Sequence, residues 1–150
     1  PEQNITMICE SFLQSKSNSE LIIIGKTNTK YYINELNKYN NNSISFLGGI
    51  YDQTILNFFR NNCQLYIHGH SVGGTNPSLI EALNVCNRTI ACFDTKYNIE
   101  VARDNAEYFT DQQSLTRIMK SNNRLRLQQW SDNRFLPKKI YDDYMKAFIK

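Results

Sequence analysis

The sequence lacks any long apolar run, because the longest one covers only residues 21–24, far short of the roughly 20 residues that a membrane-spanning helix needs. It also has little glycine, proline and cysteine, with 6, 3 and 4 residues of each. These counts exclude collagen-like chains and disulfide-stabilised scaffolds. No basic segment followed by an apolar one opens the sequence, so we expect no signal peptide.

The four cysteines show no CxxC spacing, and the two histidines complete no zinc-binding pattern. Cys9, Cys63 and Cys92 each stand among apolar neighbours. We therefore interpret them as buried thiols in a reducing compartment, and we expect a cytoplasmic protein that needs no metal.

The net charge is small, since 17 basic and 14 acidic residues leave a balance of +3. The basic excess lies in residues 117–150. It fits either a solvated helical face or a weak attraction to an anionic membrane surface, worth about 1 kcal/mol per close charge. No nucleic-acid-binding motif accompanies it, so we expect no nucleic-acid partner.

The sequence does have a regular alternation of helix-like and strand-like patterns. Its length of 150 residues suits one domain spanning residues 1–150. Helical spacing and short β-branched runs predict helices over 4–14, 29–38, 53–60 and 77–83, and strands over 21–24, 44–47, 65–68 and 89–93. A short helix and a short strand follow within 97–109, and Asp111 caps the first of two or three C-terminal helices.

This alternation predicts an α/β fold with a Rossmann-like parallel sheet and helices on both faces. The inward side chains of the second and third helices should be Tyr32, Ile33, Leu36, Ile55, Leu56 and Phe59. Such a sheet ordinarily begins with a strand, whereas this sequence begins with a helix. We therefore expect a fragment of a longer protein, with its first strand ahead of residue 1.

Ligands of such sheets bind at the carboxyl ends of the strands, which directs attention to the loop over 69–76. Asn76 suits a helix N-cap and Pro77 a first helical position. Free N–H groups at a helix start bind anions, and the adjacent glycines of the loop allow a phosphate to come close. Glu81 can accept hydrogen bonds from both hydroxyls of a ribose. The pattern indicates a nucleoside diphosphate, although it is neither a P-loop nor GxGxxG.

Residues 68–83, HGHSVGGTNPSLIEAL, resemble the donor-binding loop of retaining glycosyltransferases of family 4, which have the GT-B fold. The bacterial rhamnosyltransferase-like members are the most similar. The likeness extends over nearly the whole chain, through residues 1–4, 21–25, 44–48, 93–101 and 106–109. The resemblance implies that this chain is the C-terminal, nucleotide-sugar-binding half of such an enzyme, without its acceptor-binding N-terminal domain.

The resemblance also implies residue roles. Glu81 would bind the ribose hydroxyls, backbone groups of Asn76, Ser78 and Leu79 would hold the diphosphate, and Phe46 and Leu47 would line the base pocket. The full set of nucleotide contacts is Phe46, Leu47, Thr75, Asn76, Pro77, Ser78, Leu79 and Glu81. Fixed N–H donors of this kind stabilise a leaving diphosphate without a metal.

At the donor sugar the resemblance places Gly73 and Gly74, with His70 as a further catalytic candidate. Many family members have a glutamate where this sequence has Gly73, so its sugar contact is lost, made by backbone or supplied by His70. The basic pair that binds the diphosphate is also incomplete, and Lys26 or Lys96 are candidate replacements. His68 is either structural or catalytic, and His70 either contacts the donor or fixes the loop.

The expected activity of the whole enzyme is transfer of a hexose, for example rhamnose, from a UDP-, dTDP- or GDP-sugar with retention of configuration. The acceptor would be a surface polysaccharide, a lipopolysaccharide or a lipid-linked oligosaccharide at the inner face of the cytoplasmic membrane. The fragment alone would bind donor without catalysis and would need no cofactor. Two alternatives stay open: a non-catalytic nucleotide-sugar-binding module, and an enzyme like the non-hydrolysing nucleotide-sugar epimerases.

Overall fold

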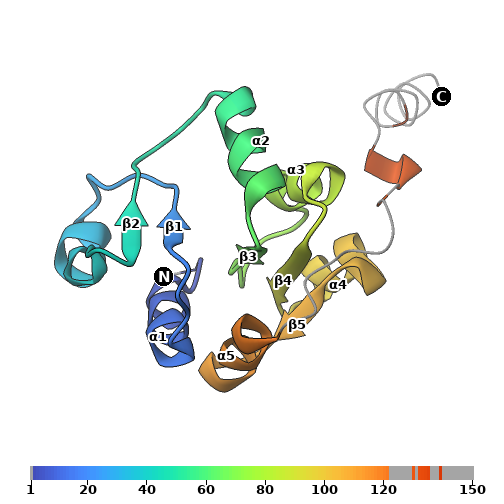
Figure 1. Ribbon diagram of the computed structural model, residues 1–150. Coiled ribbons are helices and arrows are strands. Elements are labelled where there is room, and N and C mark those ends of the chain that lie inside the picture. The colour runs from blue at the N-terminus through green and yellow to red at the C-terminus, as the bar shows by residue number, and fades with distance from the viewer. Residues whose placement is uncertain (1, 122–129, 131, 136–138, 140–150) are drawn as a thin grey trace.

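The computed structural model describes residues 2–121, 130, 132–135 and 139 and confirms an α/β fold of parallel strands with helices around them (Figure 1). The main elements follow the predicted order. They are α1 (Ile5–Ser15), β1 (Leu21–Ile23), β2 (Ile44–Phe46), α2 (Gln53–Asn62), β3 (Leu65–His68), α3 (Pro77–Val85), β4 (Thr89–Phe93), α4 (Lys96–Ala102), β5 (Glu107–Phe109) and α5 (Gln112–Lys120). None of the helices within the described residues is long and apolar enough to span a membrane.

The strands form two hydrogen-bonded parallel sheets where the sequence predicts one. β1 pairs with β2, and β3, β4 and β5 pair in that order. In Figure 1 the two sheets stand apart, with α1 below β1 and α2 above β3. The break lies between β1 and β3, so each of these strands has a strand partner on one side only among the described residues.

The larger sheet is covered on both faces because its side chains alternate. Ala91 of β4 belongs to the core cluster with α1 and α5, whereas Ile90 and Cys92 belong to the cluster with α3 and α4. Cys92 and Cys9 of α1 are fully buried free thiols, as predicted, and burial raises the pKa of each to about 12. Cys63 is half-buried.

Helix starts are fixed by local side-chain chemistry. The carboxylate of Asp52 accepts hydrogen bonds from the first turn of α2, and Thr95 does so for α4. Asp111 and Ser114 form a reciprocal capping box at α5, which confirms the predicted cap. The segment predicted as a helix over 29–38 is instead a π-helical turn, η1 (Tyr32–Leu36), followed by a 3-10 turn, η2 (Asn37–Tyr39).

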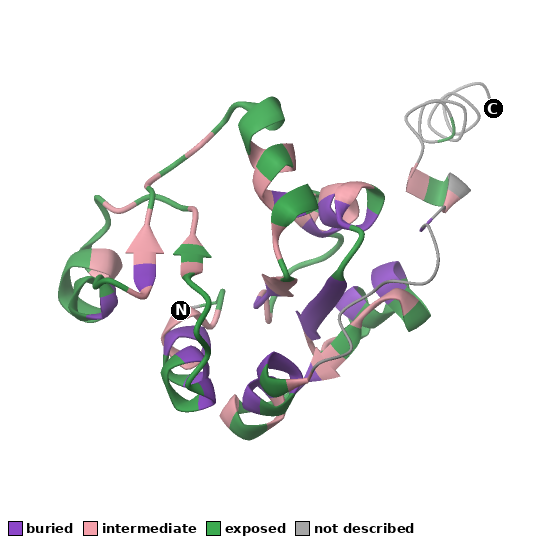
Figure 2. Cartoon of the chain, in the orientation of Figure 1, coloured by how far each residue is buried: buried purple, intermediate pink, exposed green. Residues whose placement is uncertain are grey.

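Several apolar side chains that were expected to face inward are exposed. Ile33 is 60% exposed and Ile55 of α2 is 46% exposed, so both expectations are wrong, whereas Leu36 is buried as predicted. Ile22, in a strand expected to be buried, is 39% exposed. Figure 2 shows that α2 is mostly exposed or half-buried.

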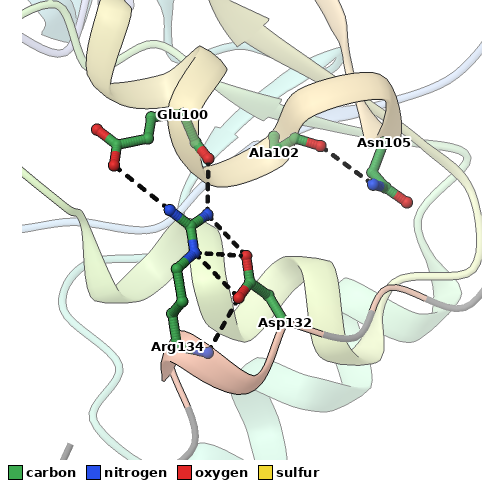
Figure 3. Close-up of polar contacts among 5 residues, drawn as sticks. All are labelled: Glu100, Ala102, Asn105, Asp132 and Arg134. Carbon is green, nitrogen blue, oxygen red and sulfur yellow. Dashed lines mark hydrogen bonds and ion pairs between the residues drawn. The ribbon is translucent and has the colours of Figure 1, made fainter. Parts of the chain in front are cut away.

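Arg134 lies in a 3-10 turn, η4 (Asn133–Phe135), and hydrogen-bonds this turn to α4. Its guanidinium donates to the Asp132 carboxylate at 2.7 Å and to the backbone carbonyl of Glu100 at 3.0 Å (Figure 3). Trp130 is buried and stacks on Phe135, which favours a packing role over a sugar-stacking one. Most of the predicted C-terminal helices after α5 lie outside the described residues.

Candidate functional site

The loop between β3 and α3 has the predicted architecture. Asn76 caps α3, its side-chain oxygen accepting hydrogen bonds from the backbone N–H of Ser78 at 3.0 Å and from its hydroxyl at 2.8 Å. Pro77 occupies the first turn, where its missing N–H has no cost. The hydroxyl of Tyr66 in β3 donates to the carbonyl of Ser78 at 3.4 Å and so ties the helix start to the sheet.

The free amides of this loop lie slightly earlier than predicted. The N–H of Leu79 donates to the carbonyl of Asn76 at 3.1 Å, and Ser78 is engaged by the cap, so neither amide is free for a ligand. Leu79 itself is fully buried. By contrast, the N–H groups of residues 73–76 donate no hydrogen bond within the described part of the chain. Among the predicted contacts, the backbones of Thr75 and Asn76 are thus available to an anion, together with those of Gly73 and Gly74.

The two glycines leave open space beside the loop. A Cβ atom on Gly73 or on Gly74 would meet no atom within 4 Å, and Gly73 has a φ of +96°, which side-chain-bearing residues rarely adopt. The glutamate that many family members place at the position of Gly73 would be strained in this backbone. The loop therefore offers amides and room in the place of that carboxylate.

Glu81 is held in place by Arg60, a residue that no sequence pattern marks. Its carboxylate accepts a hydrogen bond from the guanidinium of Arg60 at 2.6 Å, and the side chains are 37% and 8% exposed, respectively. Arg60 lies in α2 and also donates to Asn57 at 3.1 Å and Gln53 at 3.4 Å. One carboxylate oxygen, Oε2, is thus fixed by a buried cation, on a side chain that is itself partly exposed.

Two histidine rings stack at the end of β3. The centroids of His68 and His70 are 5.6 Å apart with an interplanar angle of 17°. His68 is buried, and desolvation, with a smaller contribution from the charge of His70, lowers its pKa to about 4. Its Nε2 has no hydrogen-bond partner among the described residues. The carbonyl of His70 accepts from Asn98 of α4 at 2.9 Å, so the loop is tied to the neighbouring strand end.

The N-terminal residues cross the carboxyl end of β3. The backbone N–H of Ser71 donates to the carbonyl of Glu2 at 2.8 Å, and the side chain of Asn4 donates to the carbonyl of Gly69 at 2.9 Å. A Cβ atom on Gly69 would lie 2.1 Å from the backbone oxygen of Gln3. Glycine is therefore required at position 69 by the close approach of two backbone segments.

We expect Gly69→Ala to lower the free energy of unfolding by about 2 kcal/mol, because the methyl group forces residues 2–4 away from the loop. The matched control is Gly74→Ala, where no atom lies within 4 Å and the change should be close to neutral. Urea unfolding followed by circular dichroism measures both. Equal stability of the two variants would contradict the close approach.

A large groove joins these residues. Its volume is about 1110 Å³, and its polar lining includes Arg60, His68, His70, Asn76, Ser78 and Glu81. Pro77 also lines it. Phe46 and Leu47 do not: Phe46 packs on the ring of Tyr32, and Leu47 is 45% exposed. The structure thus brings His70, both ends of the predicted anion site at Asn76 and Ser78, and Glu81 to one groove. The other predicted residues lie outside its lining: Phe46, Leu47, Gly73, Gly74, Thr75, Leu79, Lys26 and Lys96.

No protein-family model and no curated protein matches this sequence. Among solved structures, the fold is similar to that of HepE (Alr3699) from Anabaena, crystallised in complex with UDP-glucose. The TM-score is 0.68 at 18% sequence identity, and the match covers 79% of this chain and 35% of the HepE chain. The two proteins share a fold, and this chain spans about a third of HepE.

Proposed function

We propose that this chain binds a nucleoside diphosphate sugar and forms the donor-binding half of a glycosyltransferase. The observation that carries the proposal is a loop with unbonded amides at residues 73–76 that leads, through Asn76, into the groove where Arg60 holds the carboxylate of Glu81. The amides suit the diphosphate, and the carboxylate suits the ribose hydroxyls. The site lies at the carboxyl end of parallel strands, where sheets of this type bind ligands.

The finer features of the proposal come from the resemblance to family 4. The transferred group would be a hexose, for example rhamnose, carried by UDP, dTDP or GDP, and its configuration would be retained. His70, Gly73 and Gly74 would lie beside the sugar, and the amides would stabilise the leaving diphosphate without a metal. The acceptor would be a glycan or lipid-linked oligosaccharide at the inner face of the cytoplasmic membrane.

Titration calorimetry with UDP-glucose tests the donor site. Glu81→Gln keeps an acceptor oxygen for Arg60 but removes the charge, so it should fold normally and bind at least tenfold more weakly. This factor corresponds to a charged hydrogen bond worth roughly 1.5–3 kcal/mol. The control is Glu35→Gln on the exposed face of η1, which should bind as the unmodified chain does. An unchanged dissociation constant for Glu81→Gln would refute the ribose contact.

A second candidate is a non-catalytic nucleotide-sugar-binding module, favoured by the positive φ at Gly73, a backbone conformation in which a glutamate side chain would be strained. The two candidates make the same prediction for donor binding. Measuring donor turnover in a protein that also includes an acceptor domain distinguishes them. A glycosyltransferase consumes the donor, whereas a binding module does not.

A further inference from the structure

The ends of α2 and α3 bring two cysteine sulfurs together. Cys63 follows the last turn of α2, and Cys86 follows the last turn of α3. Their Sγ atoms are 3.8 Å apart and share a hydrogen bond. At this distance the two sulfurs are in van der Waals contact, and an approach of about 1.8 Å would bring them to the length of a disulfide bond.

The register of the larger sheet explains why the two cysteines meet. α2 leads into β3 and α3 leads into β4, and these strands pair in parallel with Leu65 opposite Thr89. Cys63 lies shortly before Leu65, and Cys86 lies shortly before Thr89. The two helices also pack against each other (Figure 1). Backbone pairing therefore sets the two thiols side by side at the amino ends of neighbouring strands.

The two thiols differ in access. Cys63 is half-buried and lines the groove next to Asn62 and Gln64. Cys86 is only 4% exposed. A small solute that enters the groove therefore reaches Cys63 first, with the sulfur of Cys86 already in contact behind it. A reacting thiol with a second thiol beside it is the arrangement in which a cysteine oxidised by peroxide is resolved to a disulfide.

The surroundings of the pair favour the protonated thiols. The hydrogen bond with Cys86, and then burial, raise the pKa of Cys63 above its ordinary value. The thiol of Cys63 lies 3.2 Å from the carbonyl of Arg60, and that of Cys86 lies 3.6 Å from the carbonyl of Arg88, so both carbonyls can accept their protons. Because the thiolate is the reactive form, the pair stays reduced until an oxidant is present in excess.

We propose that Cys63 and Cys86 form a redox modification site, at which an oxidant of the peroxide class produces a reversible disulfide. Hydrogen peroxide transfers one oxygen to the sulfur of Cys63, which gives a sulfenic acid and one water. The sulfur of Cys86 then attacks that of Cys63, the S–O bond breaks, and the oxygen leaves as a second water with the Cys86 proton. The two thiols lose two electrons, and the peroxide gains them. A thiol in excess restores both cysteines by exchange.

The disulfide would close residues 64–85 into a ring that contains β3, the loop over 69–76 and α3. A cross-link around a segment of this length stabilises a folded chain, because it restricts the unfolded one. The two cysteines lie at the amino ends of the strands, whereas the loop follows the carboxyl end of β3. The inference therefore does not rest on the proposed function.

The test treats the chain with hydrogen peroxide in molar excess at pH 8. Free thiols are then alkylated after unfolding, and the digested chain is analysed by mass spectrometry. We expect a peptide pair linked through Cys63 and Cys86, whereas the fully buried Cys9 and Cys92 should be recovered alkylated. The unfolding temperature should rise by roughly 5–10 °C and return to its first value with dithiothreitol.

The matched control is Cys86→Ser, which keeps Cys63 and a side chain of similar size but removes the second sulfur. It should show no linked peptides and no rise in unfolding temperature, and dimedone should trap its Cys63 as the sulfenic acid. In the unmodified chain, recovery of Cys63 as an alkylated thiol, as a sulfinic acid or in a disulfide between two chains would overturn the proposal. An equal rise in unfolding temperature in both chains would overturn it as well.

Discussion

Replacing Glu81 by leucine is expected to lower the free energy of unfolding by about 3 kcal/mol. Arg60 is 8% exposed, and its shortest hydrogen bond, 2.6 Å, goes to this carboxylate. Without it, the guanidinium keeps neutral partners such as the amides of Asn57 and Gln53. Removing one partner of a buried ion pair costs about 3–5 kcal/mol, and the lower end applies because Glu81 is half-exposed.

The double variant Arg60→Met/Glu81→Leu separates the ion pair from simple loss of packing. With both charges removed no buried cation is left unpaired, so at least half of the lost stability should return. Urea unfolding of the single and double variants gives the interaction energy. If the double variant were as unstable as the sum of the single variants, the buried pair would not be the cause.

Stability is also expected to fall by about 2 kcal/mol between pH 7 and pH 5 because of His68. Burial lowers its pKa to about 4 in the folded chain, against about 6.5 when unfolded. The unfolded chain therefore binds this proton first, and stability declines as the pH falls through 6.5. The loss is complete only below pH 4, at about 3 kcal/mol in total, by 1.36 kcal/mol per pKa unit.

Two variants isolate this effect. His68→Gln removes the titrating group and should flatten the dependence between pH 7 and pH 5. His70→Gln should keep most of it, because desolvation of His68 is the larger cause of the lowered pKa and the charge of His70 the smaller one. Unfolding free energies at several pH values measure the slopes. The same slope in His68→Gln and in the unmodified chain would show that another group is responsible.

Much of the fold could be predicted because its signals are local. The bounds of β3 and β4 agree with the short β-branched runs, and the caps Asn76 and Asp111 were readable from residue type and position. The break between β1 and β3 was not predicted, since strand pairing depends on which segments meet in space. The exposure of Ile33 and Ile55 was not predicted either, because helical spacing marks an apolar face without showing what covers it.

The candidate site was predicted in its type but not in its partners. Gly73, Gly74, Asn76 and Glu81 were selected from local spacing and from the resemblance, and of these Asn76 and Glu81 line the groove. Arg60 was missed because its contact with Glu81 joins two helices and leaves no periodic signal in the sequence. Its spacing from Gln53 and Asn57, seven and three residues earlier, marks a polar helix face but not the acid it binds.

The proposed donor site is tested most directly by nuclear magnetic resonance of the ¹⁵N-labelled chain during titration with UDP-glucose. The amide signals of residues 73–76 should shift most, since these N–H groups have no partner within the described residues and are free to bind a diphosphate. Glu81→Gln should reduce these shifts at equal ligand concentration. Shifts concentrated elsewhere in the chain, or none at millimolar UDP-glucose, would contradict the proposal.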